Sequence, residues 1–276
     1  MGNAKKKDEK LEILLSTKDQ TNLEFLTPIF SKISTINFTV LVINQTQKGQ
    51  ELTSNLNHVK IINTYTKGLS VSRNLALKHA TGDICLLADD DIKYVDGFSD
   101  IILNAFKNNP NFDVLTFMMS DFKGNLSKVY NIPKQHNYKT LVKANSVTIA
   151  FKRQQILDTK VTFDINFGLG STFEIAEEFI WLRSLYKSKL LIGFVPKLIV
   201  QHPFESTGRF GGKDKIVRAR AALFYKYSKQ FAHLKLMRYL YLMLKTQQIQ
   251  LKDVLKKYRI GSAAIQQYKT MLNSKH

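Results

Sequence analysis

Short apolar segments alternate along the first 200 residues with stretches whose apolar positions recur at helical spacing. Short apolar runs bounded by turn residues predict strands, and a period near 3.6 predicts helices. The predicted strands span residues 12–16, 38–43, 59–62, 83–88, 112–118, 147–151, 190–195 and 198–200. The predicted helices span residues 22–31, 69–80 and 97–108, with a fourth beginning near Ile175. This alternation predicts βαβ units and an α/β fold with a largely parallel sheet.

The last quarter of the chain has a different pattern. From Ile216 to His276 the spacing is helical, with breaks expected near Gln247 and Gly261. We therefore predict a flexible basic tail over residues 1–10, an α/β domain over residues 11–205 and a basic helical extension over residues 206–276.

Three consecutive aspartates follow the predicted strand 83–88. Asp89, Asp90 and Asp91 would repel one another at the end of a buried strand, so a cation or a donor-rich ligand should meet them. The carboxyl ends of strands are the ligand-binding edge of open α/β sheets. The simpler interpretation is an acidic turn that caps the next helix.

Composition indicates the compartment of the protein and one type of partner. The 276 residues are 44% hydrophobic, enough for a sizeable core, and the single cysteine, Cys85, suits a reducing cytoplasm. No signal peptide or membrane span is expected, because no apolar segment is long enough. The net charge is +19, and the last 71 residues, from Ser206, hold 16 Lys and Arg against two acids. This excess predicts an anionic partner.

The segment from Lys67 to Asp91 resembles the family 2 glycosyltransferases of the GT-A fold. In that family a glycine-leucine-serine turn leads through an Arg-Asn pair and an Ala-x-Gly helix end to an apolar strand and a D-x-D motif. The matching positions here are Gly68, Leu69, Arg73, Asn74, Ala80, Gly82, Asp89 and Asp91. The resemblance covers about residues 10–205 and implies a mostly parallel GT-A (Rossmann-like) sheet flanked by helices.

The resemblance also implies a nucleotide-sugar site. The first two strand ends would hold base and ribose, through Ser16, Thr17 and Asp19 and through Asn44 and Gln45. Lys67, Gly68 and Arg73 would lie near base or phosphates, and Asp89 and Asp90 near the ribose and diphosphate. Asn44 and Gln45 replace the usual acid with amides, which still hydrogen-bond a base edge, and the simpler alternative is that they are turn residues.

A metal ligand set follows from the same resemblance. Asp91, with Asp89 and His202, would hold Mn²⁺ or Mg²⁺ on the diphosphate. His202 follows the last predicted strand, where the family often has a histidine. A lone histidine is more often a packing or surface residue.

Glu177 and Glu178 stand in the first turns of the helix that begins near Ile175, after a glycine-rich loop. Acids there complement the helix dipole, which is a sufficient structural explanation. In the resembled family the second acid of such a pair is the catalytic base, which is Glu178 here. Glu177 stays an alternative, and Glu174 is a weaker candidate.

Two segments beyond these motifs are open to more than one interpretation. The loop Ser206–Lys215 holds Arg209, Lys213 and Lys215 and would either close over a diphosphate or form a basic linker. Leu234–Leu244 interleaves Lys235 and Arg238 with apolar and aromatic residues, which fits a helix lying on an anionic membrane or a packing helix with snorkelling lysines.

The resemblance thus implies a metal-dependent, inverting glycosyltransferase of the hexosyltransferase type. The donor would be a nucleoside-diphosphate sugar, a UDP-sugar first, and the acceptor a glycan or lipid-linked glycan of polysaccharide biosynthesis. We expect a cytoplasmic protein, peripheral at the inner face of the plasma membrane, with no nucleic-acid partner. The alternatives are a sugar-nucleotide pyrophosphorylase-like nucleotidyltransferase and a non-catalytic polyanion- or nucleic-acid-binding protein.

Overall fold

The computed structural model describes residues 9–203 and 211–274. Two compact units make up the chain, Met1–Asp164 with Glu177–Phe204, and Ile165–Ala176 with Glu205–His276. Residues 165–176, which the sequence analysis assigned to the α/β domain, group with the C-terminal helices. Most of the predicted tail 1–10 and the first half of the loop Ser206–Lys215, with Arg209, lie outside the described residues.

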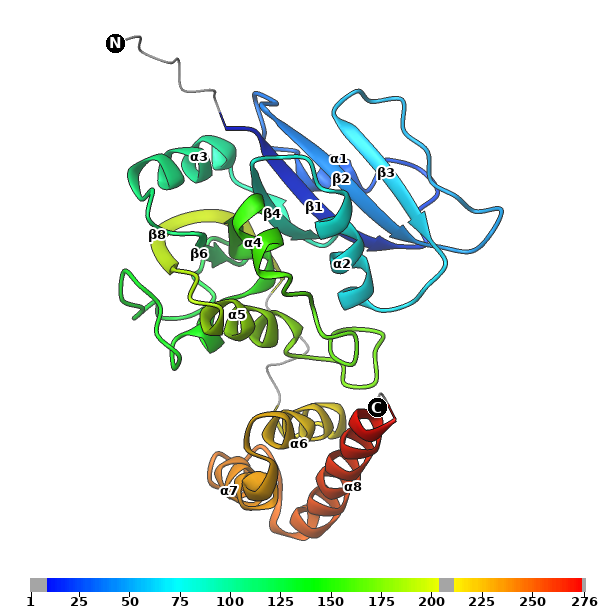
Figure 1. Cartoon of the computed structure of the whole chain (residues 1–276), viewed down its shortest axis with the longest axis vertical. Helices are drawn as coiled ribbons and strands as arrows, with labels where there is room; N and C mark the ends of the chain where they lie inside the picture. The colour runs from blue at the N-terminus through cyan, green and yellow to red at the C-terminus, as the bar shows by residue number, and fades with distance from the viewer. Residues whose placement is uncertain (1–8, 204–210, 275–276) are drawn as a thin grey trace. The chain divides into compact units, whose positions relative to one another are not determined.

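The larger unit is built on one mixed sheet (Figure 1). Its strand order is β3-β2-β1-β4-β7-β6-β8-β5. The strands are β1 Leu11–Lys18, β2 Phe38–Gln45, β3 Val59–Thr64, β4 Ile84–Asp89, β5 Lys93–Tyr94, β6 Val114–Ser120, β7 Ile149–Lys152 and β8 Ile192–Gln201. β1 to β4 run parallel, as do β6 and β8, whereas β7 is antiparallel to β4 and β6, and β5 to β8. The predicted α/β class with a mostly parallel sheet is confirmed.

Helices cover both faces of this sheet because its strands alternate side chains between two apolar clusters. In β1, Ile13 and Leu15 enter one cluster and Leu14 the other. The first cluster includes residues of α1 Leu26–Ile29 and α3 Phe98–Asn108. The second includes residues of α2 Leu69–His79, α4 Arg153–Thr159 and α5 Glu177–Lys187. Two 3₁₀ turns, Leu141–Lys143 and Ser146–Thr148, precede β7.

Two local predictions in this unit are wrong. The helix expected over 22–31 is reduced to Leu26–Ile29, because the ring of Pro28 clashes with the carbonyl four residues earlier and prevents helix before that point. The two strands expected around Pro196 are a single strand, β8. Its pairing with β6 shifts register between Thr116 and Met118, so the proline, which has no N–H, falls at an irregularity that does not need the donor.

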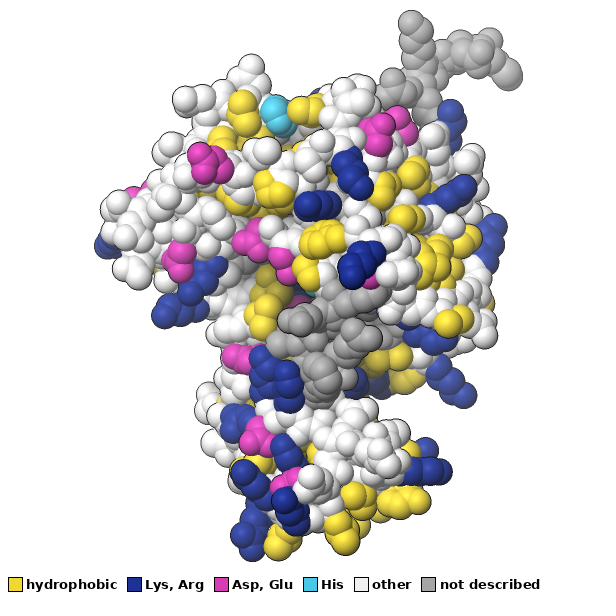
Figure 2. Space-filling view, turned by 180° about the vertical axis from the view of Figure 1, so that it is seen from behind, with side chains coloured by type: hydrophobic (Ala, Val, Ile, Leu, Met, Phe, Trp, Pro, Cys, Tyr) yellow, Lys and Arg dark blue, Asp and Glu magenta, His cyan; other side chains and the backbone are white. Residues whose placement is uncertain are grey.

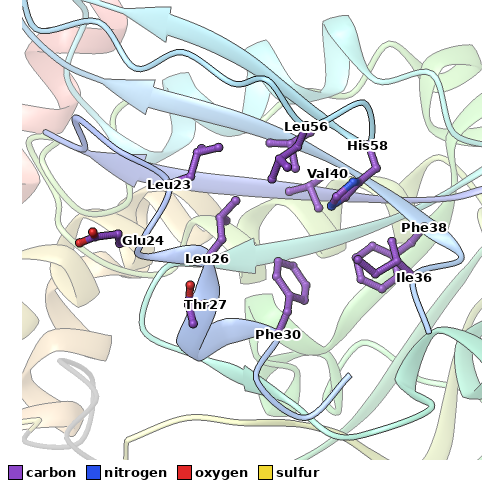
Figure 3. Close-up of a pocket in the computed structure, with 11 residues that line it drawn as sticks. Leu23, Glu24, Leu26, Thr27, Phe30, Ile36, Phe38, Val40, Leu56 and His58 are labelled. Carbon is purple, nitrogen blue, oxygen red and sulfur yellow. The ribbon is translucent and has the colours of Figure 1, made fainter. Parts of the chain in front are cut away.

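The short α1 leaves an apolar hollow of about 460 Å³ beside it (Figure 3). Figure 3 shows Leu26 and Phe30 from the α1 segment, Val40 from β2 and His58 from the turn before β3 around this hollow. The hollow lies toward the amino ends of β2 and β3. It is therefore distant along these strands from the aspartates that follow β4.

The C-terminal unit contains α6 Asp214–Ser228, α7 Ala232–Lys245 and α8 Val254–Asn273, with 3₁₀ turns Lys229–Phe231 and Leu251–Asp253. The predicted break near Gln247 is confirmed, since it falls between α7 and the second of these turns. The break expected at Gly261 is wrong, because this residue lies inside α8. A Cβ there would stand 2.6 Å from Leu236 Cδ2 of α7, so the glycine allows two helices to approach closely. None of the described helices is long and apolar enough to cross a membrane.

Candidate active site

The carboxyl ends of β1, β2 and β4 meet at one edge of the sheet. The register pairs Ser16 of β1 with Asp89 of β4, and Thr17 with Asn44 of β2. Parallel strands bring these polar residues together although they come from three separate parts of the sequence. The Oγ of Ser16 is buried and has no hydrogen-bond partner among the described residues. A buried hydroxyl without a partner is costly, and a ligand that bonds it would remove that cost.

Each of the three aspartates has a different partner in the chain. Asp89 accepts hydrogen bonds from Arg73 at 3.0 Å and from the Ser146 hydroxyl at 3.3 Å. Asp90 accepts one from the Thr17 hydroxyl. Asp91 pairs with His202, with 3.3 Å between Oδ1 and Nε2. The chain itself therefore offsets part of the repulsion that we expected an external cation to relieve.

Arg73 connects this edge of the sheet to the acid pair. Its side chain is 1% exposed, and Nη1 lies 2.8 Å from Glu177 Oε1 while Nη2 lies 3.0 Å from Asp89 Oδ1. Burial lowers the pKa of Arg73, but the carboxylates of Asp89 and Glu177 outweigh that effect and hold the pKa above its ordinary value. Arg73 is thus a buried bridge between two carboxylates, whereas the sequence analysis predicted a base or phosphate contact.

Glu178 lies beside this bridge in the first turn of α5. Burial, and next the charge of Glu177, raise the pKa of Glu178 from its ordinary value of 4.5 to about 8. Ala176, which precedes Glu177, has a φ of 76°, a left-handed conformation that non-glycine residues rarely adopt. Strained backbone of this kind occurs preferentially at functional sites. Because Arg73 engages the Glu177 carboxylate, Glu178 is left as the candidate base of the pair.

Two residues near this site were missed by the sequence analysis. Lys128, in the segment after β6, is half-buried, and its ammonium bonds the Lys143 carbonyl and the Asn145 side chain. Burial lowers the pKa of Lys128 to about 8, and the charge of Glu178 opposes that effect. Ser146 contacts Asp89. Lys128 lies in an irregular segment and Ser146 begins a 3₁₀ turn, and neither belongs to a motif, so only the folded structure brings them to Glu178 and to Asp89.

A comparison with known families decides the class of the protein. The sequence profile of "Glycosyl transferase family 2" matches residues 21–179, more than half of the chain. The chain belongs to glycosyl transferase family 2. This membership confirms the resemblance and favours sugar transfer over the nucleotidyltransferase-like and non-catalytic alternatives. No curated protein matched the sequence.

Solved structures of S. aureus TarS share the fold. The crystal structure of S. aureus TarS 1–349 superposes with a TM-score of 0.55 at 15% identity, covering 94% of this chain and 80% of that one. The same fragment in complex with UDP gives a TM-score of 0.52 at 17% identity, with 90% and 80% covered. Its complex with UDP-GlcNAc gives 0.52 at 14% identity, with 94% and 81% covered. The predicted GT-A architecture is confirmed by this likeness and by the family match.

The structure gives several of the predicted donor-binding residues structural partners. The Asn44 amide is fully buried and bonds both the N–H and the carbonyl of Gln20. Gln45 Oε1 accepts the N–H of Gly68 at 2.7 Å, at the start of α2. Asp19 pairs with its neighbour Lys18 at 3.2 Å, and Lys67 is exposed. Asn44 and Gln45 thus hold together the segments that follow β1 and precede α2. Whether either residue binds a nucleotide stays a prediction.

Among the described residues at this edge, Asp91 and His202 form a pair of side chains that suits a divalent metal. Asp91 Oδ1 faces His202 Nε2, while His202 Nδ1 donates to the carbonyl of Pro203 at 2.6 Å. Both oxygens of Asp89 are engaged by Arg73 and Ser146. Among the described residues no group of three or more His, Cys, Asp or Glu side chains is arranged to hold a metal. Mg²⁺ commonly takes one or two protein ligands and completes its shell with substrate phosphates and water, which this pair allows.

Proposed function

We propose that this glycosyltransferase moves a sugar from a nucleoside-diphosphate sugar, a UDP-sugar first, to a hydroxyl group of a glycan or lipid-linked glycan, with inversion at the anomeric carbon. One observation carries the proposal. The chain Asp89–Arg73–Glu177 is a continuous set of contacts from the strand-end aspartates to the helix that bears Glu178. These contacts support the proposal because they link the proposed donor-binding edge to the helix of the candidate base within one unit of the protein.

The donor would lie across the ends of β1, β2 and β4. Ser16 is available there, because its buried Oγ has no partner among the described residues and would bond a donor hydroxyl or phosphate oxygen. Asp91 and His202 would hold Mn²⁺ or Mg²⁺, while Asp89, the third ligand that the resemblance implied, stays bonded to Arg73 and Ser146. When bound, the metal would offset the charge that grows on the leaving diphosphate.

Glu178 would act as the general base. Its carboxylate takes the proton of the acceptor hydroxyl as the oxygen bonds to the anomeric carbon. The bond from that carbon to the diphosphate oxygen breaks, and the nucleoside diphosphate leaves with the electron pair. Attack on the face opposite the leaving group inverts the anomeric configuration. A pKa near 8 suits this task, because a base works best when its pKa lies near the working pH.

The acceptor and the compartment are part of the proposal. The net charge of +19 and the basic last quarter favour an acceptor at an anionic surface, and a lipid-linked glycan at the inner face of the plasma membrane meets that condition. TarS, whose fold this chain shares, has been crystallised with UDP and with UDP-GlcNAc, which supports testing UDP donors first.

A thermal-shift panel tests the function. We expect UDP with Mn²⁺ to raise the melting temperature more than UDP or Mn²⁺ alone, since a ligand that binds the folded state stabilises it. Asp91→Ala should lose this metal-dependent gain, and Asp100→Ala, whose surface carboxylate bonds Asn37, should keep it. Stabilisation by nucleic acid alone, or an unchanged gain in Asp91→Ala, would contradict the proposal.

A further inference from the structure

We propose that the exposed face of α7 and the start of α8 docks the protein on an anionic lipid bilayer. The α7 face consists of four apolar and three basic residues. They are Leu234, Met237, Tyr241 and Leu242, with Lys235, Arg238 and Lys245. The inference rests on the C-terminal unit alone, so it stands or fails independently of the catalytic proposal.

The α7 face is exposed although it is apolar. Leu234 and Tyr241 are each 62% exposed and Met237 is 53% exposed. Their spacing of three and four residues puts them on one side of the helix. The opposite side of α7 is buried through Ala232, Leu236 and Leu240, and Leu236 contacts α8 at Gly261. The exposed side therefore takes no part in the packing of the C-terminal unit.

Exposed apolar residues also stand beside lysines in the segment that follows α7. Leu251 is 74% exposed and Leu255 is 60% exposed, at the 3₁₀ turn before α8 and at the start of α8. Lys252 and Lys256 alternate with them and are exposed too. Figure 2 shows hydrophobic side chains beside Lys and Arg at the lower edge of the C-terminal unit. Apolar and basic groups are thus mixed on one surface.

Charge decides which partner fits this surface. From Lys229 to Arg259 the chain has eight Lys and Arg and one acid, Asp253. A second copy of the same face would bring cations against cations, which disfavours a symmetric dimer. Nucleic acid would leave the leucines, Met237 and Tyr241 without an apolar partner. A bilayer with anionic lipids receives both groups, since cations attract its headgroups and apolar side chains enter the acyl boundary.

Such docking would bring the enzyme to a surface that carries lipid-linked acceptors. The structure places no apolar residues of comparable exposure and number next to so many cations elsewhere in a single described helix. This is the arrangement of an interfacial helix, which lies in the headgroup plane. The acceptor would then meet the enzyme by diffusion in two dimensions.

Co-sedimentation of the full chain with lipid vesicles tests the inference. The probes are vesicles of phosphatidylcholine alone and vesicles that also contain phosphatidylglycerol. We expect binding to the second kind only, weakened by added salt because surface charges are screened. Leu234→Ser with Tyr241→Ser should reduce binding at least about tenfold through lost apolar burial, and Arg238→Gln with Lys245→Gln should reduce both binding and its salt dependence.

A matched control distinguishes binding through the α7 face from non-specific binding through any exposed apolar side chain. Leu126→Ser with Val129→Ser removes two apolar side chains that are 48% and 88% exposed in the larger unit, and it should leave binding unchanged. Circular dichroism confirms that each variant keeps its helices. Equal binding to phosphatidylcholine alone, equal loss in the control, a concentration-dependent dimer in place of vesicle binding, or wild-type binding by both α7 variants would overturn the inference.

Discussion

Arg73 and Glu177 form a buried ion pair, with Nη1 and Oε1 2.8 Å apart, although 104 residues separate them in the sequence. The second guanidinium nitrogen bonds Asp89. Arg73 of α2 therefore joins Asp89, the last residue of β4, to the acid pair at the start of α5. Buried ion pairs of this kind fix geometry more than they add stability, because desolvation offsets most of the attraction. Here the geometry fixed is the relation between the donor-binding edge and Glu178.

Removing the guanidinium should destabilise the larger unit strongly. Arg73→Met leaves Asp89 and Glu177 without their cation, and breaking one side of a buried pair costs about 3–5 kcal/mol. Trp181 is the single tryptophan and is buried in the same unit, stacked on Phe163. Its fluorescence during denaturant unfolding reports on this unit directly. Arg259→Gln is the matched control, because Arg259 is exposed in the other unit. A loss below about 1 kcal/mol in Arg73→Met would mean that the bridge is not a structural element.

Glu178→Gln should keep donor binding and lose sugar transfer. The amide has the same shape but cannot accept the acceptor proton, and losing a general base costs about 10²- to 10⁴-fold in rate. UDP-sugar consumption in the presence of an acceptor measures transfer, and a melting-temperature shift with UDP and Mn²⁺ measures binding. Glu174→Gln is the control, because this acid is 40% exposed and pairs with Lys215. Full transfer by Glu178→Gln, or a loss confined to Glu174→Gln, would assign the base elsewhere.

The rate should depend on pH through Glu178. Since burial raises its pKa to about 8, the carboxyl is mostly protonated at neutral pH and must lose its proton to act as a base. We expect kcat/KM to rise roughly tenfold per pH unit below that value and to level off above it. The residual activity of Glu178→Gln should not show this rise of kcat/KM toward pH 8. A flat profile from the neutral range to about pH 9 in the wild type would contradict this assignment.

The stability of the folded protein should fall as the pH rises, whereas the rate of transfer rises. A carboxyl whose pKa is raised on folding binds its proton more tightly in the folded state. The stability from this proton is fully present below the ordinary value of 4.5 and is lost as the pH rises through about 8. Glu178→Gln, which cannot ionise, should therefore gain melting temperature relative to the wild type between about pH 5 and pH 9. A difference that stays constant over this range would mean that the pKa of Glu178 is not raised.

Much of the fold could be predicted from sequence because strands and helices have different periods. The apolar run before Asp89 and the spacing of α2 are strong signals of this kind, and both elements lie within one residue of their expected ends. The motif from Gly68 to Asp91 placed the chain in its family. Predictions failed where the role of a residue depends on its contact with a distant part of the chain. Gly261 looks like a helix end in sequence, but in the structure it is the point where α8 meets Leu236.

The candidate site was harder to predict because its contacts join distant segments. Arg73 and Glu177 belong to separate motifs, and nothing in the sequence shows that they touch. The sequence pattern indicates one cation-binding cluster at the three aspartates, whereas each has a different partner, Arg73, Thr17 or His202. Lys128 carries no motif at all. Its burial and its proximity to Glu178 depend on the path of the segment after β6, which pattern analysis does not predict.

Anomalous diffraction from crystals of the protein grown with UDP and Mn²⁺ would locate both the metal and the nucleotide. We expect one manganese peak between the Asp91 carboxylate and His202 Nε2, in contact with both phosphates of UDP, with the ribose at the ends of β1 and β2. UDP bound at another surface, or a manganese ion held without Asp91 or His202, would contradict this expectation.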